Sequence, residues 1–168
     1  SEEYARKADE NSGIIVVPAF VGLGAPYWDD ACRGAIFGLT RGTTKEDITK
    51  ATLDALAYQT KDVVDLMQET AKMPITKLRV DGGASRNDYL MQRQADIMQC
   101  AIIRGKMSET TALGAARLAG FATGFWKLSD FQKQNQEDVL FEPQMDAKQA
   151  DVLVQKWKQA VKAARVFE

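Results

Sequence analysis

The sequence has no histidine, and it has only two cysteines and four prolines among its 168 residues. Without an imidazole, the chain cannot contain a Ser-His or Cys-His nucleophilic site or an imidazole-ligated metal centre. Cys32 and Cys100 lie far apart in the sequence and lack the spacing of a metal site. Such cysteines are typical of reduced thiols, so we expect a cytoplasmic protein.

Long apolar runs and clusters of one charge are also missing. No stretch reaches the roughly 18 apolar residues of a membrane span, and the charged first residues do not resemble a secretory signal. The 22 Lys and Arg residues nearly balance the 23 Asp and Glu residues and are dispersed along the chain. We therefore expect no membrane insertion and no binding of nucleic acid.

The remaining composition, 45% hydrophobic and 27% charged, is that of a globular domain with one sizeable core. Short apolar runs alternate with amphipathic helical patterns, which indicates an α/β fold with parallel neighbouring strands. The predicted strands are 13–20, 33–39, 77–81, 101–105 and 139–143, the last of them a strand or a turn. The predicted helices are 44–72, 86–99, 110–124 and 147–168.

Two of these helices carry more specific expectations. In the helix over 44–72 the apolar residues recur at helical spacing, and we expect Leu53 and Leu56 to be buried across the sheet. In the helix over 110–124, small residues four apart make one face nearly flat, which predicts close packing on the sheet. These small residues are Ala112, Ala116, Gly120 and Gly124.

Two adjacent glycines, Gly82 and Gly83, separate the strand over 77–81 from the helix that follows. Glycine can take positive φ and lets a ligand come close to the main chain, and the amino end of a helix attracts anions. Ser85 and Asp88 have the spacing of a capping box that would start the helix. A plain strand-to-helix connection explains the same glycines equally well, so both interpretations stay open at this point.

Other polar and aromatic residues have structural interpretations beside functional ones. Asp29 and Asp30 form a carboxylate pair, but their proximity to Arg33 favours an ion pair over acid/base or metal duty. Tyr27 and Trp28, next to a proline, favour packing over ligand stacking. A strand-end Asp before two glycines, Asp81, is more typical of a turn residue than of a catalytic group.

Four long motifs follow one another along the chain: "FVGLGAPYWDDACRGAIFGLTRG" (20–42), "LDALAYQTKDV" (53–63), "RVDGGASRNDYLMQ" (79–92) and "ETTALGAARLAG" (109–120). In their order and spacing they are similar to the FGGY family of carbohydrate kinases. The span 34–54 also fits that family's second signature, and the similarity covers roughly residues 13–165. We therefore interpret 1–12 as an N-terminal extension or flexible start and 13–168 as the C-terminal, nucleotide-binding domain.

The resemblance implies one lobe of an actin-like, ribonuclease H-like ATPase fold, with a mixed sheet, flanking helices and its first strands missing. It implies ATP or ADP with Mg²⁺ in a cleft between two lobes. By match to the motif, Gly83, Ala84 and Asn87 would contact the nucleotide, and Gly82 would shape the turn. No catalytic residue and no metal ligand can be assigned, because the family's base and phosphate loop lie upstream of this chain's start.

The implied reaction is phosphoryl transfer from ATP to glycerol, giving sn-glycerol 3-phosphate, with the isolated fragment inactive. The implied partners are the N-terminal lobe of the same kinase, glycerol or a related polyol, and further copies of the intact chain. Two alternatives stay open. One is a lobe acting on another sugar or polyol, and the other is a non-enzymatic actin-like nucleotide-binding module.

Overall fold

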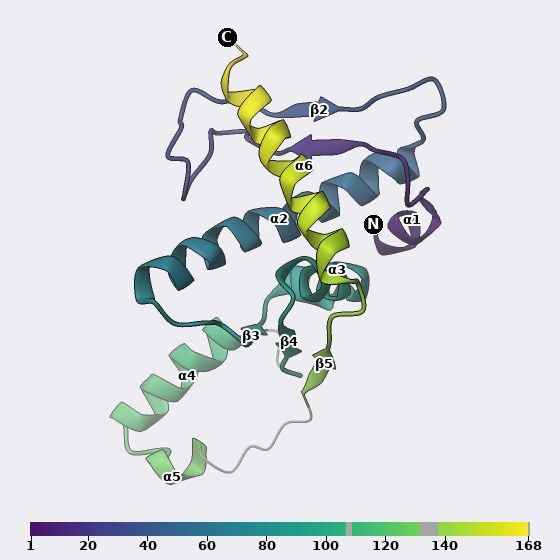
Figure 1. Ribbon diagram of the computed structural model, residues 1–168. Coiled ribbons are helices and arrows are strands. Elements are labelled where there is room, and N and C mark those ends of the chain that lie inside the picture. The colour runs from purple at the N-terminus through teal and green to yellow at the C-terminus, as the bar shows by residue number, and fades with distance from the viewer. Residues whose placement is uncertain (107–108, 132–137, 168) are drawn as a thin grey trace.

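The computed structural model (Figure 1) describes residues 1–106, 109–131 and 138–167. All nine predicted elements are present in it, most of them within two or three residues of the predicted ends. The strands are β1 (Ile15–Val17), β2 (Ala35–Phe37), β3 (Lys77–Val80), β4 (Ala101–Arg104) and β5 (Val139–Phe141). The helices are α1 (Glu2–Lys7), α2 (Lys45–Ala71), η1 (Gly83–Arg86, a 3-10 turn), α3 (Asp88–Met98), α4 (Thr110–Ala122), α5 (Leu128–Phe131) and α6 (Ala147–Arg165).

The strands form two small sheets. β1 and β2 pair antiparallel, and a three-stranded sheet has the order β3-β4-β5. In the latter, β3 and β4 run parallel, as expected for strands joined through a helix, whereas β4 and β5 are antiparallel. The mixed sheet is thus confirmed, and the expectation of parallel neighbours holds for the β3–β4 pair.

Helix α2, with 27 residues, packs against α1, α3 and β1. Thr44 and Asp47 form a reciprocal capping box at its start: the Asp47 amide donates to the Thr44 hydroxyl (3.2 Å), and the Thr44 amide donates to the Asp47 carboxylate (2.9 Å). Leu53 is buried as predicted, but Leu56 is 39% exposed, so that prediction is wrong. Helical spacing places Leu56 on the side opposite most of the buried residues of α2.

Core residues of α2 and α6 meet where the two helices cross (Figure 1). Trp157 of α6 is fully buried and stacks on Tyr58 of α2, with ring centroids 5.4 Å apart. Its indole N–H donates to the carboxylate of Asp62 (2.7 Å), which also accepts from the hydroxyl of Tyr27 (2.8 Å). We call Tyr27, Tyr58, Asp62 and Trp157 the α2–α6 junction.

The junction places a carboxylate in the core, and burial raises the pKa of Asp62 above its ordinary value. The hydrogen bonds from Trp157 and Tyr27 act in the opposite direction, because they stabilise the charged form. The carboxylate is therefore held by two donors that replace part of its lost hydration.

Residues 1–12 were interpreted as an N-terminal extension or flexible start, and within them Glu2–Lys7 form helix α1. This helix packs against α2 and α3. Two ion pairs on its surface, Glu2 with Arg6 and Glu3 with Lys7, each join residues four positions apart and help to stabilise this short helix.

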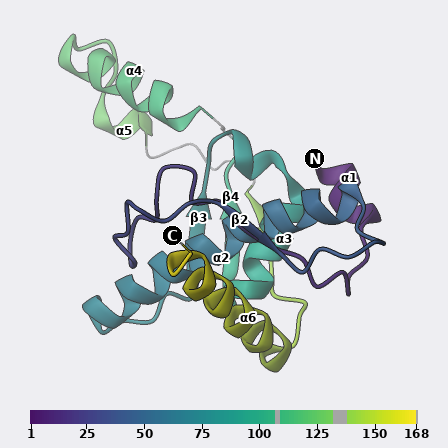
Figure 2. The same ribbon diagram turned by 90° about the horizontal axis from the view of Figure 1, so that it is seen from above.

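Helices α4 and α5 extend away from the rest of the chain in both views (Figures 1 and 2). Among the residues of α4, all of which the structure describes, Gly120 is the only buried one, whereas Leu118 is 72% exposed. The predicted packing of the small-residue face on the sheet is therefore wrong for this chain. Gly120 is instead covered by Trp126, whose ring fills the space that a Cβ would need. None of the helices in the described ranges is long and apolar enough to cross a membrane.

Candidate functional site

The turn between β3 and α3 is built on a backbone that only glycine adopts readily. Gly82 has φ +82° and ψ 176°, a region almost closed to residues with a Cβ. Its carbonyl accepts from both the hydroxyl (2.7 Å) and the amide (3.2 Å) of Ser85, which is buried. The turn is therefore fixed from within, and its backbone at Gly82 favours a residue without a Cβ.

The two usual structural reasons for a glycine, a positive φ and close packing, do not apply to Gly83. Its φ does not lie in the left-handed region, and no atom of the described residues comes within 4 Å of the Cβ that an alanine would add. Gly22 and Gly38 differ, since a Cβ there would lie 2.6 and 2.5 Å from main-chain oxygen atoms. The chain's own packing does not require the missing side chain at Gly83, and the space beside it is open to a ligand.

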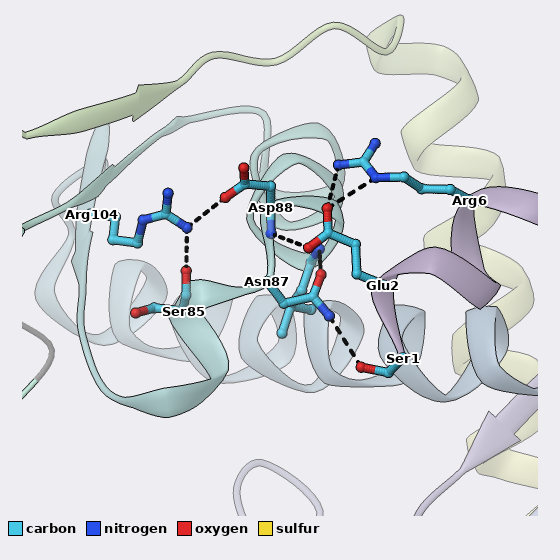
Figure 3. A network of polar contacts seen from close by, with 8 residues as sticks. Ser1, Glu2, Arg6, Ser85, Asn87, Asp88 and Arg104 are labelled. Atoms are coloured by element: carbon cyan, nitrogen blue, oxygen red, sulfur yellow. Dashed lines mark hydrogen bonds and ion pairs between the residues drawn. The ribbon is translucent and has the colours of Figure 1, made fainter.

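Asn87 starts helix α3. Its side-chain oxygen accepts from the amide of Leu90 (3.0 Å), while its NH₂ group makes one long contact, 3.5 Å, to the hydroxyl of Ser1 (Figure 3). The predicted capping box of Ser85 and Asp88 is wrong, because Ser85 lies in the 3-10 turn and bonds back to Gly82. The side-chain oxygen of Asn87 thus caps helix α3, whereas its NH₂ group makes only the one long hydrogen bond.

The first amides of α3 are already occupied by side chains. The amide of Asp88 donates to the carboxylate of Glu2 (3.1 Å), which Arg6 holds by an ion pair of 2.7 Å (Figure 3). The amide of Leu90 is taken by Asn87. The helix end is therefore not an open anion site in this chain, and the turn offers open space and an amide group instead.

Arg104, at the end of β4, ties the turn to the helix. Its guanidinium donates to the carbonyl of Ser85 (2.7 Å) and to the carboxylate of Asp88 (2.6 Å) (Figure 3). The guanidinium also lies over the ring of Phe141, 5.2 Å from its centroid. No sequence pattern predicted a role for this arginine. Its only signal is a cation at a strand end, and its partners 16 and 19 residues away become visible only in the fold.

Asp81 lies between β3 and the glycines, and the hydroxyl of Thr110 donates to its carboxylate. Since Thr110 is the first residue of α4, this contact links the turn to the start of that helix. The interpretation of Asp81 as a turn residue agrees with this bond.

The carboxylate pair at 29–30 has a different partner from the one predicted. Asp29 pairs with Arg165 of α6 (2.8 Å), and this hydrogen bond lowers the pKa of Asp29. Arg33 donates to main-chain carbonyls, including that of Asp30 (2.7 Å). Trp28 is 79% exposed, so the expectation that it packs is wrong. Its neighbour Tyr27 belongs to the α2–α6 junction, where its hydroxyl donates to the carboxylate of Asp62.

Residues 1–123 match the model of the FGGY family of carbohydrate kinases, C-terminal domain. The chain is 56% identical over its whole length to a glycerol kinase of Bacillus licheniformis and 55% identical to one of Enterococcus casseliflavus. It spans about a third of each, 34% and 33% of their lengths. A crystal structure of Plasmodium falciparum glycerol kinase with ADP is similar over 99% of this chain and 33% of that one, with TM-score 0.86 and 33% identity.

Proposed function

Because the chain belongs to the FGGY family of carbohydrate kinases, we propose that it is the nucleotide-binding lobe of a glycerol kinase. In the intact enzyme this lobe would help transfer the terminal phosphoryl group of ATP to glycerol, giving ADP and sn-glycerol 3-phosphate. The chain supplies the actin-like ATPase fold of the C-terminal domain and about a third of the length of the relatives it matches.

The observation that carries the proposal is the open space beside Gly83, on a turn that is otherwise rigid. A nucleotide could lie against the main chain of Gly83 and Ala84 because no side chain fills that space. The NH₂ group of Asn87, which has only a 3.5 Å contact, could donate to the nucleotide while its oxygen keeps the helix capped. Gly82 would fix the path of the turn.

Phosphoryl transfer depends on positioning and on charge neutralisation, and Mg²⁺ bridging the phosphates supplies much of the latter. Within residues 1–106, 109–131 and 138–167 no group of three carboxylate or thiol side chains is placed to hold such an ion. We assign this chain the task of holding the nucleoside end of ATP. The acceptor, the base and the phosphate loop are assigned to the remainder of the kinase, which is its proposed partner.

Two alternatives are less well supported. A lobe of a kinase for another sugar or polyol would have the same fold, but the relatives at 55–56% identity are named glycerol kinases. A non-enzymatic actin-like module is disfavoured by the family match over residues 1–123. That the intact enzyme is cytoplasmic and assembles from several copies stays a prediction.

A chimera tests the proposal. The part of the Bacillus licheniformis glycerol kinase that precedes the matched region is joined to this chain, and ATP-dependent phosphorylation is assayed with glycerol, xylulose and gluconate. We expect ATP-dependent phosphorylation of glycerol by the chimera and no turnover by the 168-residue chain alone, because proximity of the reactants contributes roughly 7–11 kcal/mol of the barrier.

The chimera with Gly83→Val is the matched control, since this change fills the proposed nucleotide space and leaves the acceptor side untouched. If the Gly83→Val chimera folds and still uses ATP normally, the nucleotide assignment is contradicted. A folded chimera without ATP-dependent turnover would contradict the assignment of this chain as the nucleotide-binding lobe.

A further inference from the structure

A cavity of about 310 Å³ lies beside the α2–α6 junction. It is bounded by α2, by α6 and by the loop that contains Pro26 and Tyr27. Leu66 of α2 and Val161 of α6 supply apolar surface, and the rest of the lining is charged. Its volume is at the lower end of the range for sites that take small organic molecules.

The carboxylate of the junction, Asp62, is only 6% exposed, and one of its oxygens lacks a hydrogen-bond donor. Trp157 (2.7 Å) and Tyr27 (2.8 Å) both donate to Oδ2, whereas no described residue donates to Oδ1. Oδ1 is nevertheless not sealed from solvent, because among the described residues Arg93 Nε alone is both sealed and unpartnered. Since Asp62 lines the cavity, a buried carboxylate oxygen is open to a donor from that side.

The charged groups of the lining are equal in number but separated by element. Helix α2 contributes three carboxylates and α6 contributes three cations, so the lining as a whole has no net charge. The six residues are Asp62, Asp65 and Glu69 on α2, and Lys158, Lys162 and Arg165 on α6. The cavity therefore has one acidic and one basic wall.

The two walls face each other without an ion pair between them in the described part of the chain. One group on each wall is paired with a residue outside the lining: Asp65 with Lys61 (2.6 Å) and Arg165 with Asp29 (2.8 Å). The charge of Lys158 acts to lower the pKa of Asp62, against the larger effect of burial, so this lysine lies near the carboxylate across the cavity. The acidic wall thus keeps a free acceptor, and the basic wall keeps two lysines that form no ion pair with any described residue.

We propose that this cavity binds a small zwitterion of the amino-acid type, with its ammonium group on Oδ1 of Asp62 and its carboxylate facing Lys158 and Lys162. The ammonium group supplies the donor that Oδ1 lacks, in a charge-assisted hydrogen bond. A zwitterion adds no net charge to a lining that has none, whereas an amine alone would be repelled by the basic wall and a carboxylate alone by the acidic one. No residue of the β3–α3 turn lines this cavity, so the site is separate from the proposed nucleotide site.

The test follows the ¹H–¹⁵N signal of the Trp157 indole in the 168-residue chain, because this N–H donates to Asp62. Three zwitterions with increasing separation of their charges are titrated at constant ionic strength: glycine, β-alanine and γ-aminobutyrate. We expect a saturable shift of the Trp157 signal with at least one of them, while the signal of the exposed Trp28 stays in place.

Other ligands isolate the two ends of the zwitterion. Butylamine and butyrate each carry one of the two charged groups of γ-aminobutyrate, and we expect neither to produce the saturable shift. The N-trimethyl derivative of the best zwitterion keeps both charges but has no N–H donor, and we expect it to bind about tenfold more weakly, the effect of a hydrogen bond to a charged group.

Variants place the zwitterion in this cavity. Asp62→Asn keeps an acceptor for Trp157 and puts an NH₂ group in place of Oδ1, so it should weaken binding about tenfold or more. Lys162→Met removes a cation from the exposed rim and should weaken binding about threefold. Lys156→Met is the matched control, since it makes the same change of charge on α6 outside this cavity, and it should leave binding unchanged.

The proposal is overturned if none of the three zwitterions shifts the Trp157 signal, or if butylamine or butyrate shifts it equally. It is also overturned if Lys156→Met weakens binding as much as Lys162→Met does, because the ligand would then respond only to net charge. This comparison does not depend on the buried Asp62. None of these outcomes bears on the nucleotide assignment, which concerns the β3–α3 turn.

Discussion

The α2–α6 junction and the β3–α3 turn are built by opposite means. At the junction, large side chains fill the core, and the indole and phenol both find a buried carboxylate. At the turn, two side chains are missing, and the space beside them is not filled by the chain. The first arrangement stabilises the fold. The second leaves room for a ligand, and its glycines lower stability because glycine loses more backbone entropy on folding than other residues do.

The largest effect is expected at the junction. Trp157→Ala should lower the free energy of unfolding by about 3–5 kcal/mol, because it opens a cavity and removes the donor to Asp62. Leu118→Ala, on the exposed surface of α4, should change it by less than about 0.5 kcal/mol. Urea unfolding of both variants checks the pair. Equal losses would show that α4 is as tightly packed as α6.

The next largest effect is a difference in stability between alanine substitutions at the two glycines of the turn. Gly82→Ala forces a Cβ into a backbone region that costs about 1–3 kcal/mol, and unfolding should become easier by that amount. Gly83→Ala meets no neighbour and should leave stability within about 0.5 kcal/mol. The same urea measurement applies, and a large loss for Gly83→Ala would mean that its side chain is missing for reasons of packing.

Asn87 allows capping and binding to be distinguished. Asn87→Ala should cost about 1 kcal/mol of stability through loss of the cap, whereas Asn87→Ser retains a capping oxygen. Both variants lack the amide donor, so in the chimeric kinase both should weaken ATP about tenfold, or roughly 1.4 kcal/mol. Glycerol affinity serves as the internal control. An unchanged KM for ATP in Asn87→Ser would refute the contact.

A smaller, pH-dependent effect is expected from Asp62, whose pKa is raised by burial. A raised folded-state pKa means that the native state binds the proton more tightly, so stability should increase as pH falls through that pKa. The gain levels off below the ordinary value of 3.8. Unfolding of the wild type and of Asp62→Asn between about pH 7 and pH 4 should therefore diverge in favour of the wild type on acidification. A constant difference between them would contradict a raised pKa.

Local patterns were sufficient to predict the elements. The helix over 44–72 is α2 with its two caps, because its start signal and apolar period all lie within the segment. The strand, turn and helix around Gly82 and Gly83 were likewise predicted from adjacent residues. Patterns of this kind depend on near neighbours, which the sequence displays directly.

One error is local, the capping box of Ser85 and Asp88, because Ser85 bonds back to Gly82 instead. Other errors depend on how distant segments pack. Asp29 meets Arg165, 136 residues away, rather than the nearby Arg33. Leu56 is apolar but lies on the side of α2 that the core does not use. At the turn, sequence patterns pointed to the glycines and Asn87 but not to Arg104, which contacts the carbonyl of Ser85 from the end of β4. Choosing among such partners requires the tertiary fold, which periodicity does not contain.

A titration of the 168-residue chain with ADP tests the nucleotide assignment most directly, followed through its backbone amide signals in the wild type and in Gly83→Val. The account predicts weak binding, about 1 mM or weaker because half the pocket is absent, with the signals of residues 82–87 shifting most. It also predicts that Gly83→Val stays folded and loses these shifts. Equal shifts in a folded Gly83→Val, or shifts confined to other parts of the chain, would contradict it.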